Sequence, residues 1–311
     1  MQNQHLPMFP LVGIFVTCFF WIPVLGQDEI LINGLPENCG NRPPLQPPPG
    51  GYTGAKTEAK ENDWPWHVGL YASVYGSYPF CGGTLISPTW VLTAAHCIQM
   101  ALRCYPVPFG QPFSYEKVSP HTLMVLIGGH NWTDDRTPRY FFGIKHIIMH
   151  PDFPDYHDKI GFDFALLKLK RAVIRSKQMS FTCLPKSGFK INMGSTCFFA
   201  GWGLIPNPPN KPFEIQPQVL MEKPGTIVDM SKCKKAHPEI LKHNHVCVKQ
   251  KFGTPCNGDS GGALNCAKND GTWILYGIAA YIDSNCKKKY FASVSTDSVL
   301  TWIKETIQKY N

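Results

Sequence analysis

Short apolar runs separated by glycines, prolines and polar residues follow one another along the chain from Trp64 onward. Runs rich in β-branched and aromatic residues are typical of strands, and their imperfect alternation fits strands that are buried on both faces. The predicted strands cover residues 67–71, 83–87, 90–93, 122–127 and 141–149. The pattern therefore predicts an all-β fold, built as a barrel or a sandwich.

Two segments depart from the strand pattern. Residues 98–120 contain four prolines, too many for a strand or a helix, and we expect a long surface loop there. Residues 297–307 instead carry apolar side chains at helical spacing, with Asp297 or Ser298 available to cap the start. This segment is predicted to be a C-terminal helix that packs on the body.

The residues before the strand pattern divide into two parts. An apolar run over residues 11–25, followed by small residues, predicts a signal peptide at 1–26. The run is shorter than the ~20 residues of a membrane span, so we expect no membrane span after its removal. The proline-rich stretch in 27–52 is extended and builds no core, which predicts a linker or propeptide. Residues 53–311 remain as the folded domain.

Composition agrees with a secreted globular protein. Of the 311 residues, 43% are hydrophobic and 17% charged, which argues against disorder. Cys18 lies in the predicted signal peptide, so eleven of the 12 cysteines remain in an exported chain, where disulfides are favoured. Their spacing resembles no zinc site, and we expect neither a metal nor a cofactor. Asn131 begins an Asn-Trp-Thr sequon and is a candidate for glycosylation.

The formal net charge of +8 comes largely from lysines in the C-terminal half. We interpret these lysines as a solvated basic face in preference to a dedicated anion site. Nucleic acid is not an expected partner for a secreted chain.

A candidate nucleophile lies late in the sequence, where Ser260 stands between glycines and follows Asp259. The loop could equally be a tight glycine-rich turn, unless a base and a carboxylate complete the site. His96 follows a predicted strand among small residues, and Asp163 directly precedes an apolar strand at 164–169. These two side chains supply the missing partners.

The segments TAAHC, DFALLKL and GDSGGAL occur in the order His, Asp, Ser, and through them the chain resembles the chymotrypsin-like (trypsin-family, S1) serine proteases. The segments 64–68, 81–86 and 200–203 are also similar, and the resemblance covers about 53–307. It implies two six-stranded antiparallel β-barrels with a C-terminal α-helix and an active site between the barrels.

The resemblance also implies a role for each site residue. Ser260 would attack the scissile carbonyl, His96 would serve as base and then acid, and Asp163 would orient the histidine. The backbone N–H groups of Gly258 and Ser260 would form the oxyanion hole. Asp259 would be a structural acid that pairs with a buried ammonium. The implied disulfides are Cys39–Cys183, Cys81–Cys97, Cys197–Cys266, Cys233–Cys247 and Cys256–Cys286, of which the first tethers the segment 27–52.

Cys104 remains without a partner in this scheme. We favour a buried or capped thiol, and the alternative is a link to another chain.

The sequence departs from the family at the activation site. Members are usually cut after Arg or Lys to expose an Ile-Val-Gly-Gly-type N-terminus whose ammonium pairs with the acid before the serine. The equivalent place here lies near Thr53, follows Tyr52, and has no basic residue or Ile-Val pair, while Lys56 lies beyond it. Asp259 should then find another partner or turn outward, because an unpaired buried carboxylate is costly. Either a nonstandard cut near Tyr52 activates a zymogen, or the chain never becomes fully active.

The expected specificity pocket also departs from the family. Thr254 stands where trypsin-like enzymes carry an acid, so cleavage after Lys or Arg is not expected. Ala280, Tyr281 and Ile282 replace the usual walls, with Ile282 narrowing the pocket. Lys289 takes the place of a second wall glycine; it would favour acidic residues if it points inward, but we favour an outward, solvated position.

A third departure is the predicted loop at 98–120, which is longer than usual and would overhang the cleft. Together these features predict a secreted, extracellular serine endopeptidase of narrow, non-tryptic specificity. Its expected partners are a protein or peptide substrate and protein protease inhibitors. The alternative is a weak or inactive homologue, a pseudoprotease that acts as a binding protein.

Overall fold

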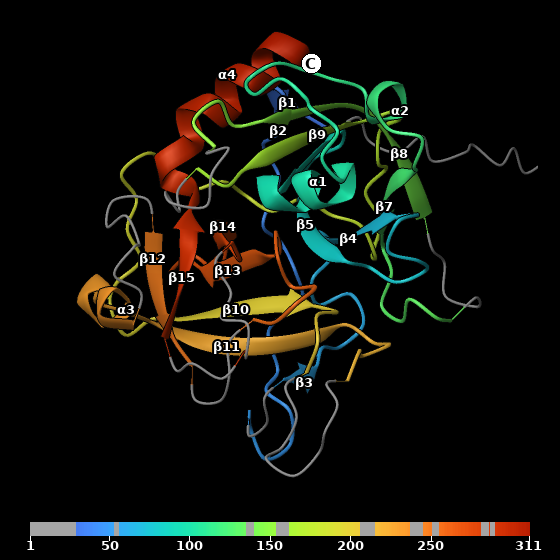
Figure 1. Cartoon of the computed structure of the whole chain (residues 1–311). Coiled ribbons are helices and arrows are strands. Elements are labelled where there is room, and N and C mark those ends of the chain that lie inside the picture. The colour runs from blue at the N-terminus through green and yellow to red at the C-terminus, as the bar shows by residue number, and fades with distance from the viewer. Residues whose placement is uncertain are drawn as a thin grey trace, which may run out of the picture.

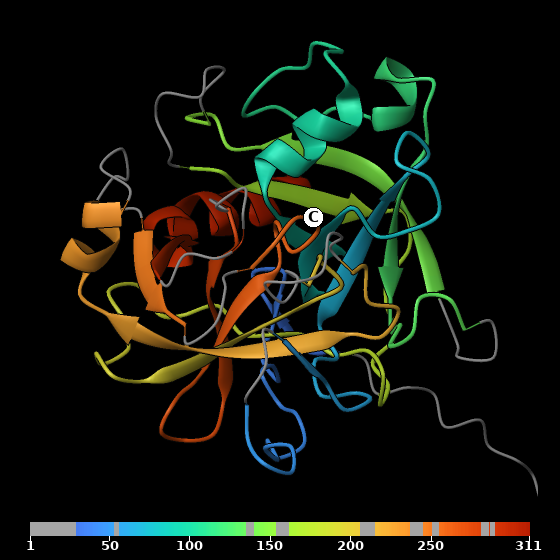
Figure 2. The same cartoon turned by 60° about the horizontal axis from the view of Figure 1, so that its bottom comes forward.

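The computed structural model describes residues 29–52, 56–134, 140–153, 162–205, 215–236, 245–250, 255–280, 286 and 290–311. Figures 1 and 2 show two β-structured halves side by side, one formed by β4–β9 and the other by β10–β15.

The first half is a closed, antiparallel barrel in the order β4-β5-β6-β9-β8-β7. Its strands run over His67–Ala72 (β4), Cys81–Ser87 (β5), Trp90–Thr93 (β6), Leu123–Ile127 (β7), Tyr140–Met149 (β8) and Ala165–Leu169 (β9). Every residue of β5, β6 and β9 is buried, so these strands lack a polar face.

The second half is a ring of six antiparallel strands, because β10 pairs with β13 on one side and with β11 on the other. Its strands run over Thr196–Gly201 (β10), Met221–Val228 (β11), His245–Lys249 (β12), Ala263–Ala267 (β13), Trp273–Ile278 (β14) and Tyr290–Ser295 (β15). A two-residue strand from the N-terminal segment, β3 (Thr57–Glu58), adds to the outer side of β11. The predicted fold of two six-stranded barrels with a C-terminal helix is confirmed.

Contacts between the barrels fix their relative position. The Trp66 indole N–H of the first barrel donates a hydrogen bond of 2.8 Å to Asn265 Oδ1 of the second, and both side chains are buried. The backbone N–H of Gly82 donates to the carbonyl of Ser260 at 2.8 Å. A buried hydrogen bond stabilises modestly when made and costs more when broken, so these contacts specify one docking geometry.

The predicted strands agree with β4, β5, β6, β7 and β8 to within two residues at either end. The expectation for 98–120 is wrong in part. Helix α1 (Ala95–Leu102) extends into this segment, and a short helix α2 (Tyr115–Val118) lies within it. The Tyr115 hydroxyl donates to the Ala101 carbonyl at 2.8 Å, and Phe113 pairs with Ile147 of β8. Prolines do not exclude a helix that fits between them.

The C-terminal helix is confirmed, with a different start. A 3-10 turn, η2 (Thr296–Val299), precedes helix α4 (Leu300–Tyr310). The side chain of Ser295, before either predicted capping residue, accepts a hydrogen bond from the backbone N–H of Asp297. On the inner face of α4, Ile303 and Ile307 are fully buried in the main core.

The remaining short elements are β1 (Leu31–Ile32) and β2 (Leu35–Pro36), which form a hairpin, and helix α3 (Met230–Ala236). Within the described ranges, no helix is long and apolar enough to cross a bilayer. Residues 1–26, which carry the predicted signal peptide, fall outside those ranges.

The described chain contains five disulfides, and they are the pairs that the resemblance implies. Cys39–Cys183 ties the N-terminal segment to the body across 144 residues of sequence. Cys104 is a free and exposed cysteine, so a buried thiol is wrong and a capped thiol or a link to another chain remains.

Candidate active site

Strand pairing in the first barrel brings His96 and Asp163 together. His96 lies in the first turn of α1, three residues after the end of β6, and Asp163 lies two residues before β9. Strands β6 and β9 are neighbours, with Thr93 opposite Ala165. The C-terminal end of one strand and the N-terminal end of the other therefore meet at one edge of the barrel.

The contact between these residues orients the imidazole ring. His96 Nδ1 lies 2.5 Å from Asp163 Oδ2, and the His96 backbone N–H donates to Oδ1 at 2.8 Å. A carboxylate can only accept, so in the neutral ring Nδ1 carries the proton and Nε2 keeps its lone pair. Burial lowers the pKa of His96, but the Asp163 carboxylate and its hydrogen bond raise the pKa by more, so the net shift is upward.

Ser260 lies in the turn between Cys256 and β13 and faces the first barrel. Its carbonyl accepts the hydrogen bond from Gly82 and lies 3.6 Å from the sulfur of Cys97. Cys97 is the neighbour of His96 in α1, and His96 Nε2 lies 3.8 Å from the same sulfur. These contacts bring the loop of Ser260 against the start of α1.

Backbone donors beside Ser260 are available for a ligand. In the described part of the chain, no carbonyl accepts the N–H of Gly258 or of Ser260, whereas the N–H of Gly261 donates to Ala279 at 2.7 Å. Gly258 has φ +94° and approaches Gly203 so closely that a Cβ would lie 3.0 Å from the Gly203 Cα. A non-glycine residue is disfavoured at such a φ, which explains the glycine here.

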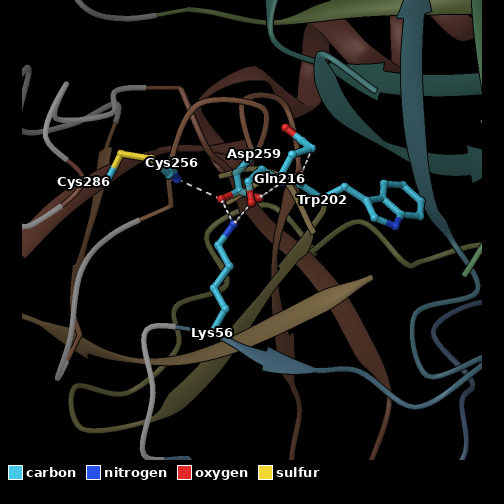
Figure 3. Close-up of polar contacts among 7 residues, drawn as sticks. Lys56, Trp202, Gln216, Cys256, Asp259 and Cys286 are labelled. Atoms are coloured by element: carbon cyan, nitrogen blue, oxygen red, sulfur yellow. Dashed lines mark hydrogen bonds and ion pairs between the residues drawn. A yellow bond between two sulfur atoms is a disulfide. The ribbon is translucent and has the colours of Figure 1, made fainter. Parts of the chain in front are cut away.

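The carboxylate of Asp259 points toward the ammonium of Lys56 (Figure 3). Oδ1 accepts the backbone N–H of Gly203 at 3.0 Å, and Oδ2 accepts the backbone N–H of Cys256 at 2.8 Å. The ammonium of Lys56 lies 2.5 Å from Oδ2 and also donates to the Gly203 carbonyl at 2.7 Å. Asp259 thus has the partner that the sequence required of it, and it does not turn outward.

Close packing surrounds this carboxylate. A Cβ on Gly203 would lie 2.4 Å from the Asp259 Cγ, so only glycine fits there. The backbone of Gly203 is positioned from its other side as well, because the Gln216 amide donates to the Trp202 carbonyl (Figure 3).

Most of the expected specificity pocket falls outside the described residues. Thr254, Tyr281, Ile282 and Lys289 lie there, and Ala280 is described and half-buried. Asn131 is partly exposed, and its side-chain oxygen accepts hydrogen bonds from Thr133.

The described residues contain one group of metal-ligand type, formed by Cys81, His96 and Cys97. Its two sulfurs are joined in a disulfide and offer no thiolate to a metal ion.

The sequence interpretation missed the role of Lys56, which it placed beyond the activation site. The available signal was a lysine within a few residues of that site, in a chain that lacks the usual N-terminus. It also missed Glu222, which accepts hydrogen bonds from Trp64 Nε1 at 2.8 Å and the Tyr52 hydroxyl at 2.9 Å.

The chain forms two six-stranded barrels, with a histidine–carboxylate pair at the edge of one and a serine loop from the other. This arrangement is a chymotrypsin-like architecture. The family model described as Trypsin matches residues 54–303, and the chain belongs to the trypsin family of serine proteases.

Several curated proteins are similar to the chain over most of their length. Chymotrypsin-like elastase family member 3B of Homo sapiens is 30% identical over 259 residues, which cover 81% of this chain and 88% of the relative. Chymotrypsin-like elastase family member 3A of Homo sapiens is 30% identical over 85% of this chain and 93% of the relative. For chymotrypsin-like elastase family member 1 of Canis lupus familiaris the identity is 30%, over 81% of this chain and 90% of the relative.

Proposed function

We propose that the protein is a secreted serine endopeptidase in which Ser260, His96 and Asp163 form the catalytic triad. The observation that carries the proposal is the His96–Asp163 contact, which in the neutral ring leaves Nε2 as the acceptor, at the edge where the Ser260 loop meets the first barrel. Such a nitrogen is the base that a serine nucleophile needs.

The reaction follows from these positions. Ser260 Oγ attacks the scissile carbonyl while His96 Nε2 takes the hydroxyl proton, and Asp163 stabilises the imidazolium that results. The N–H groups of Gly258 and Ser260 donate to the oxyanion, a contribution of about 3–4 kcal/mol per donor in such sites. His96 then protonates the leaving amine, and an acyl-enzyme forms. Water, deprotonated by His96, hydrolyses the ester and releases the second product.

The proposed specificity is narrow and non-tryptic. The sequence supports it, because Thr254 replaces an acid and Ile282 replaces a small wall residue. The similar proteins are named chymotrypsin-like elastases, which agrees with a specificity other than for Lys or Arg. Fluorogenic peptides with Ala, Phe, Asp, Glu or Arg at the cleavage position test this, and preferential cleavage after Arg would contradict it.

Secretion is part of the proposal. The apolar run at 11–25 and the five disulfides both support an oxidising, extracellular location. Glycosylation at Asn131 fits this location, since the sequon lies at a partly exposed turn. Protein substrates and protein inhibitors are the proposed partners, and a zymogen cut near Thr53 remains a prediction that N-terminal sequencing of the secreted chain tests.

A second candidate is a pseudoprotease that binds without cleaving, favoured by the missing activation sequence around Thr53. A serine-reactive fluorophosphonate probe separates the two candidates. The secreted protein should become labelled, and a Ser260→Ala variant should not. If the protein stays unlabelled both uncut and cut near Thr53, the pseudoprotease is the better account.

A further inference from the structure

The ion pair between Lys56 and Asp259 is deeply enclosed, and no catalytic step uses it. Both side chains are about 5% exposed, and Nζ lies 2.5 Å from Oδ2. Burying a lone carboxylate or ammonium costs several kcal/mol, so each charge depends on the other. The pair therefore holds together the two segments of the chain that carry Lys56 and Asp259.

One member is attached to the N-terminal segment. Lys56 directly precedes β3, where Thr57 pairs with Glu222 and Glu58 pairs with Met221 of β11. On the other side of the lysine, the Tyr52 hydroxyl donates to Glu222. These anchors hold the segment against the second barrel in the uncut chain, so the Lys56 side chain reaches Asp259 without any break in the backbone.

The other member is attached to the serine loop. Asp259 lies between Gly258 and Ser260, the two proposed oxyanion donors. Its carboxylate accepts two backbone N–H groups and the lysine ammonium, and its own N–H donates to the Cys256 carbonyl at 2.8 Å. A side chain held on three sides fixes the direction of the peptide units before and after it. Loss of the ammonium would leave a charged carboxylate short of a partner and would favour a different turn.

We propose that Lys56 is a positioning residue that holds the Ser260 loop in its catalytic shape in the uncut chain, by supplying the buried ammonium for Asp259 from an internal side chain. This inference rests on the proposed function, since a loop has a catalytic shape only in an enzyme. On this account the predicted cut near Thr53 is not required for activity. A new N-terminal ammonium would find the Asp259 carboxylate already occupied.

A second lysine at the same cavity provides a matched control. Lys56, Lys223 and Asp259 all line one small cavity beneath the serine loop. Among the described residues the Lys223 ammonium has no hydrogen-bond partner, and burial together with the nearby Lys56 lowers its pKa to about 7. Lys223 thus shares the location and chemistry of Lys56 but lacks a contact with the carboxylate.

The test uses the full secreted chain, kept uncut and checked by N-terminal sequencing. The fluorophosphonate labelling rate of Ser260 and the kcat and KM for a peptide substrate are measured for wild type, Lys56→Met and Lys223→Met. We expect the uncut wild type to be labelled. Lys56→Met should lose about 100-fold in labelling rate and in kcat with KM little changed, because one misplaced oxyanion donor costs about 10²–10³ in kcat. Lys223→Met should behave as wild type.

A pH profile gives a readout that a merely structural role would not move. Burial lowers the pKa of the Lys56 ammonium, against the opposing effect of Asp259, so activity should fall on the alkaline side before an ordinary lysine titrates. Lys223, Glu222 and His67 also lie around this pair, but none supplies the ammonium that Asp259 contacts. In Lys56→Arg, activity should be restored relative to Lys56→Met and should persist at least about one pH unit higher, because the guanidinium stays charged above pH 12. The wild-type alkaline limb is informative even if a variant folds poorly.

The outcomes separate this inference from the proposed function. For comparison, a version with a specific protease site inserted before Thr53 is cut and labelled. If wild type becomes labelled only after that cut, the enzyme stands and the inference is overturned. Equal labelling of uncut wild type and Lys56→Met, or the absence of an alkaline limb, also overturns the inference alone. No labelling of either form overturns both.

Discussion

Two aspartates near the proposed active site each pair with a basic side chain from a distant segment of the chain. Asp163 pairs with His96, whose side chain is 25% exposed, and Asp259 pairs with Lys56, whose side chain is 5% exposed. Both contacts measure 2.5 Å. The first pair lies at the open edge of the first barrel, and the second lies in an enclosed site beside β10 and β11 of the second barrel.

The two pairs differ in their exposure to solvent and in the basic side chain that each contains. An imidazole at an open edge can gain and lose a proton during a reaction, because its pKa lies within reach of neutral pH. The ammonium of Lys56, enclosed beside a carboxylate, takes no part in proton transfer and serves to hold a backbone in place. The same attraction between opposite charges therefore supports proton transfer in one region and loop geometry in the other.

The largest expected effect follows from removing His96, the base of the His96–Asp163 pair. His96→Ala should lower kcat/KM by about 10⁴–10⁶-fold, because Ser260 then has no group to accept its proton. Peptide hydrolysis measures the loss. The unfolding midpoint should stay close to that of wild type, and a comparable loss in Lys223→Met would contradict this assignment.

Replacing Asp163, the acid of the His96–Asp163 pair, should lower activity by less. Asp163→Asn removes the acceptor that fixes the proton on His96 Nδ1, and we expect kcat to fall about 10⁴-fold. Fluorophosphonate labelling and peptide hydrolysis should fall together. An activity within tenfold of wild type would show that another group orients the histidine.

Breaking the enclosed pair should act on stability as well. Asp259→Asn leaves the Lys56 ammonium buried without a carboxylate, which costs about 3–5 kcal/mol when one partner of a buried pair is removed. Urea unfolding with the disulfides intact measures this cost. Asp163→Asn, which makes the same substitution in the His96–Asp163 pair, is the matched control.

The double variant Lys56→Met/Asp259→Asn should recover much of the lost stability, because neither charge then remains buried alone. If Asp259→Asn unfolds at the same urea concentration as wild type, the two pairs do not differ in the way proposed.

The smallest expected effect is a displaced pH profile. Since the pKa of His96 is raised by Asp163, and only neutral His96 can act as base, kcat/KM should rise with pH through a midpoint above that of an ordinary histidine. Below the midpoint the rate should fall about tenfold per pH unit. In Asp163→Asn the midpoint should move to lower pH. A wild-type midpoint below the ordinary histidine range would contradict the raised pKa.

Local patterns in the sequence were sufficient for the strands of the first barrel. The apolar runs at 67–71 and 90–93 lie within β4 and β6, because strands buried on both faces must be apolar throughout. The resemblance in turn supplied the two-barrel fold and the cysteine pairs that the structure contains.

Patterns were less informative where tertiary contacts decide the outcome. The short helix α2 forms between prolines, with Tyr115 buried and its hydroxyl bonded to Ala101. No periodicity in 98–120 indicates this contact. The exposed position of Cys104 likewise depends on how α1 ends, at Arg103 with φ +48°. The sequence interpretation favoured a buried or capped thiol, of which the buried thiol is wrong.

The sequence by itself indicated which chemistry was at hand: a serine in a glycine-rich loop, together with a histidine and an aspartate that each lie next to a predicted strand. It also indicated that Asp259 must either find a partner or turn outward, because an isolated buried charge is too costly. Only the tertiary structure decided between these outcomes and supplied Lys56 as the partner. Lys56 and Asp259 are 203 residues apart, and the pairing of β3 with β11 brings them together. A contact over that separation depends on where the N-terminal segment docks, which no local pattern encodes.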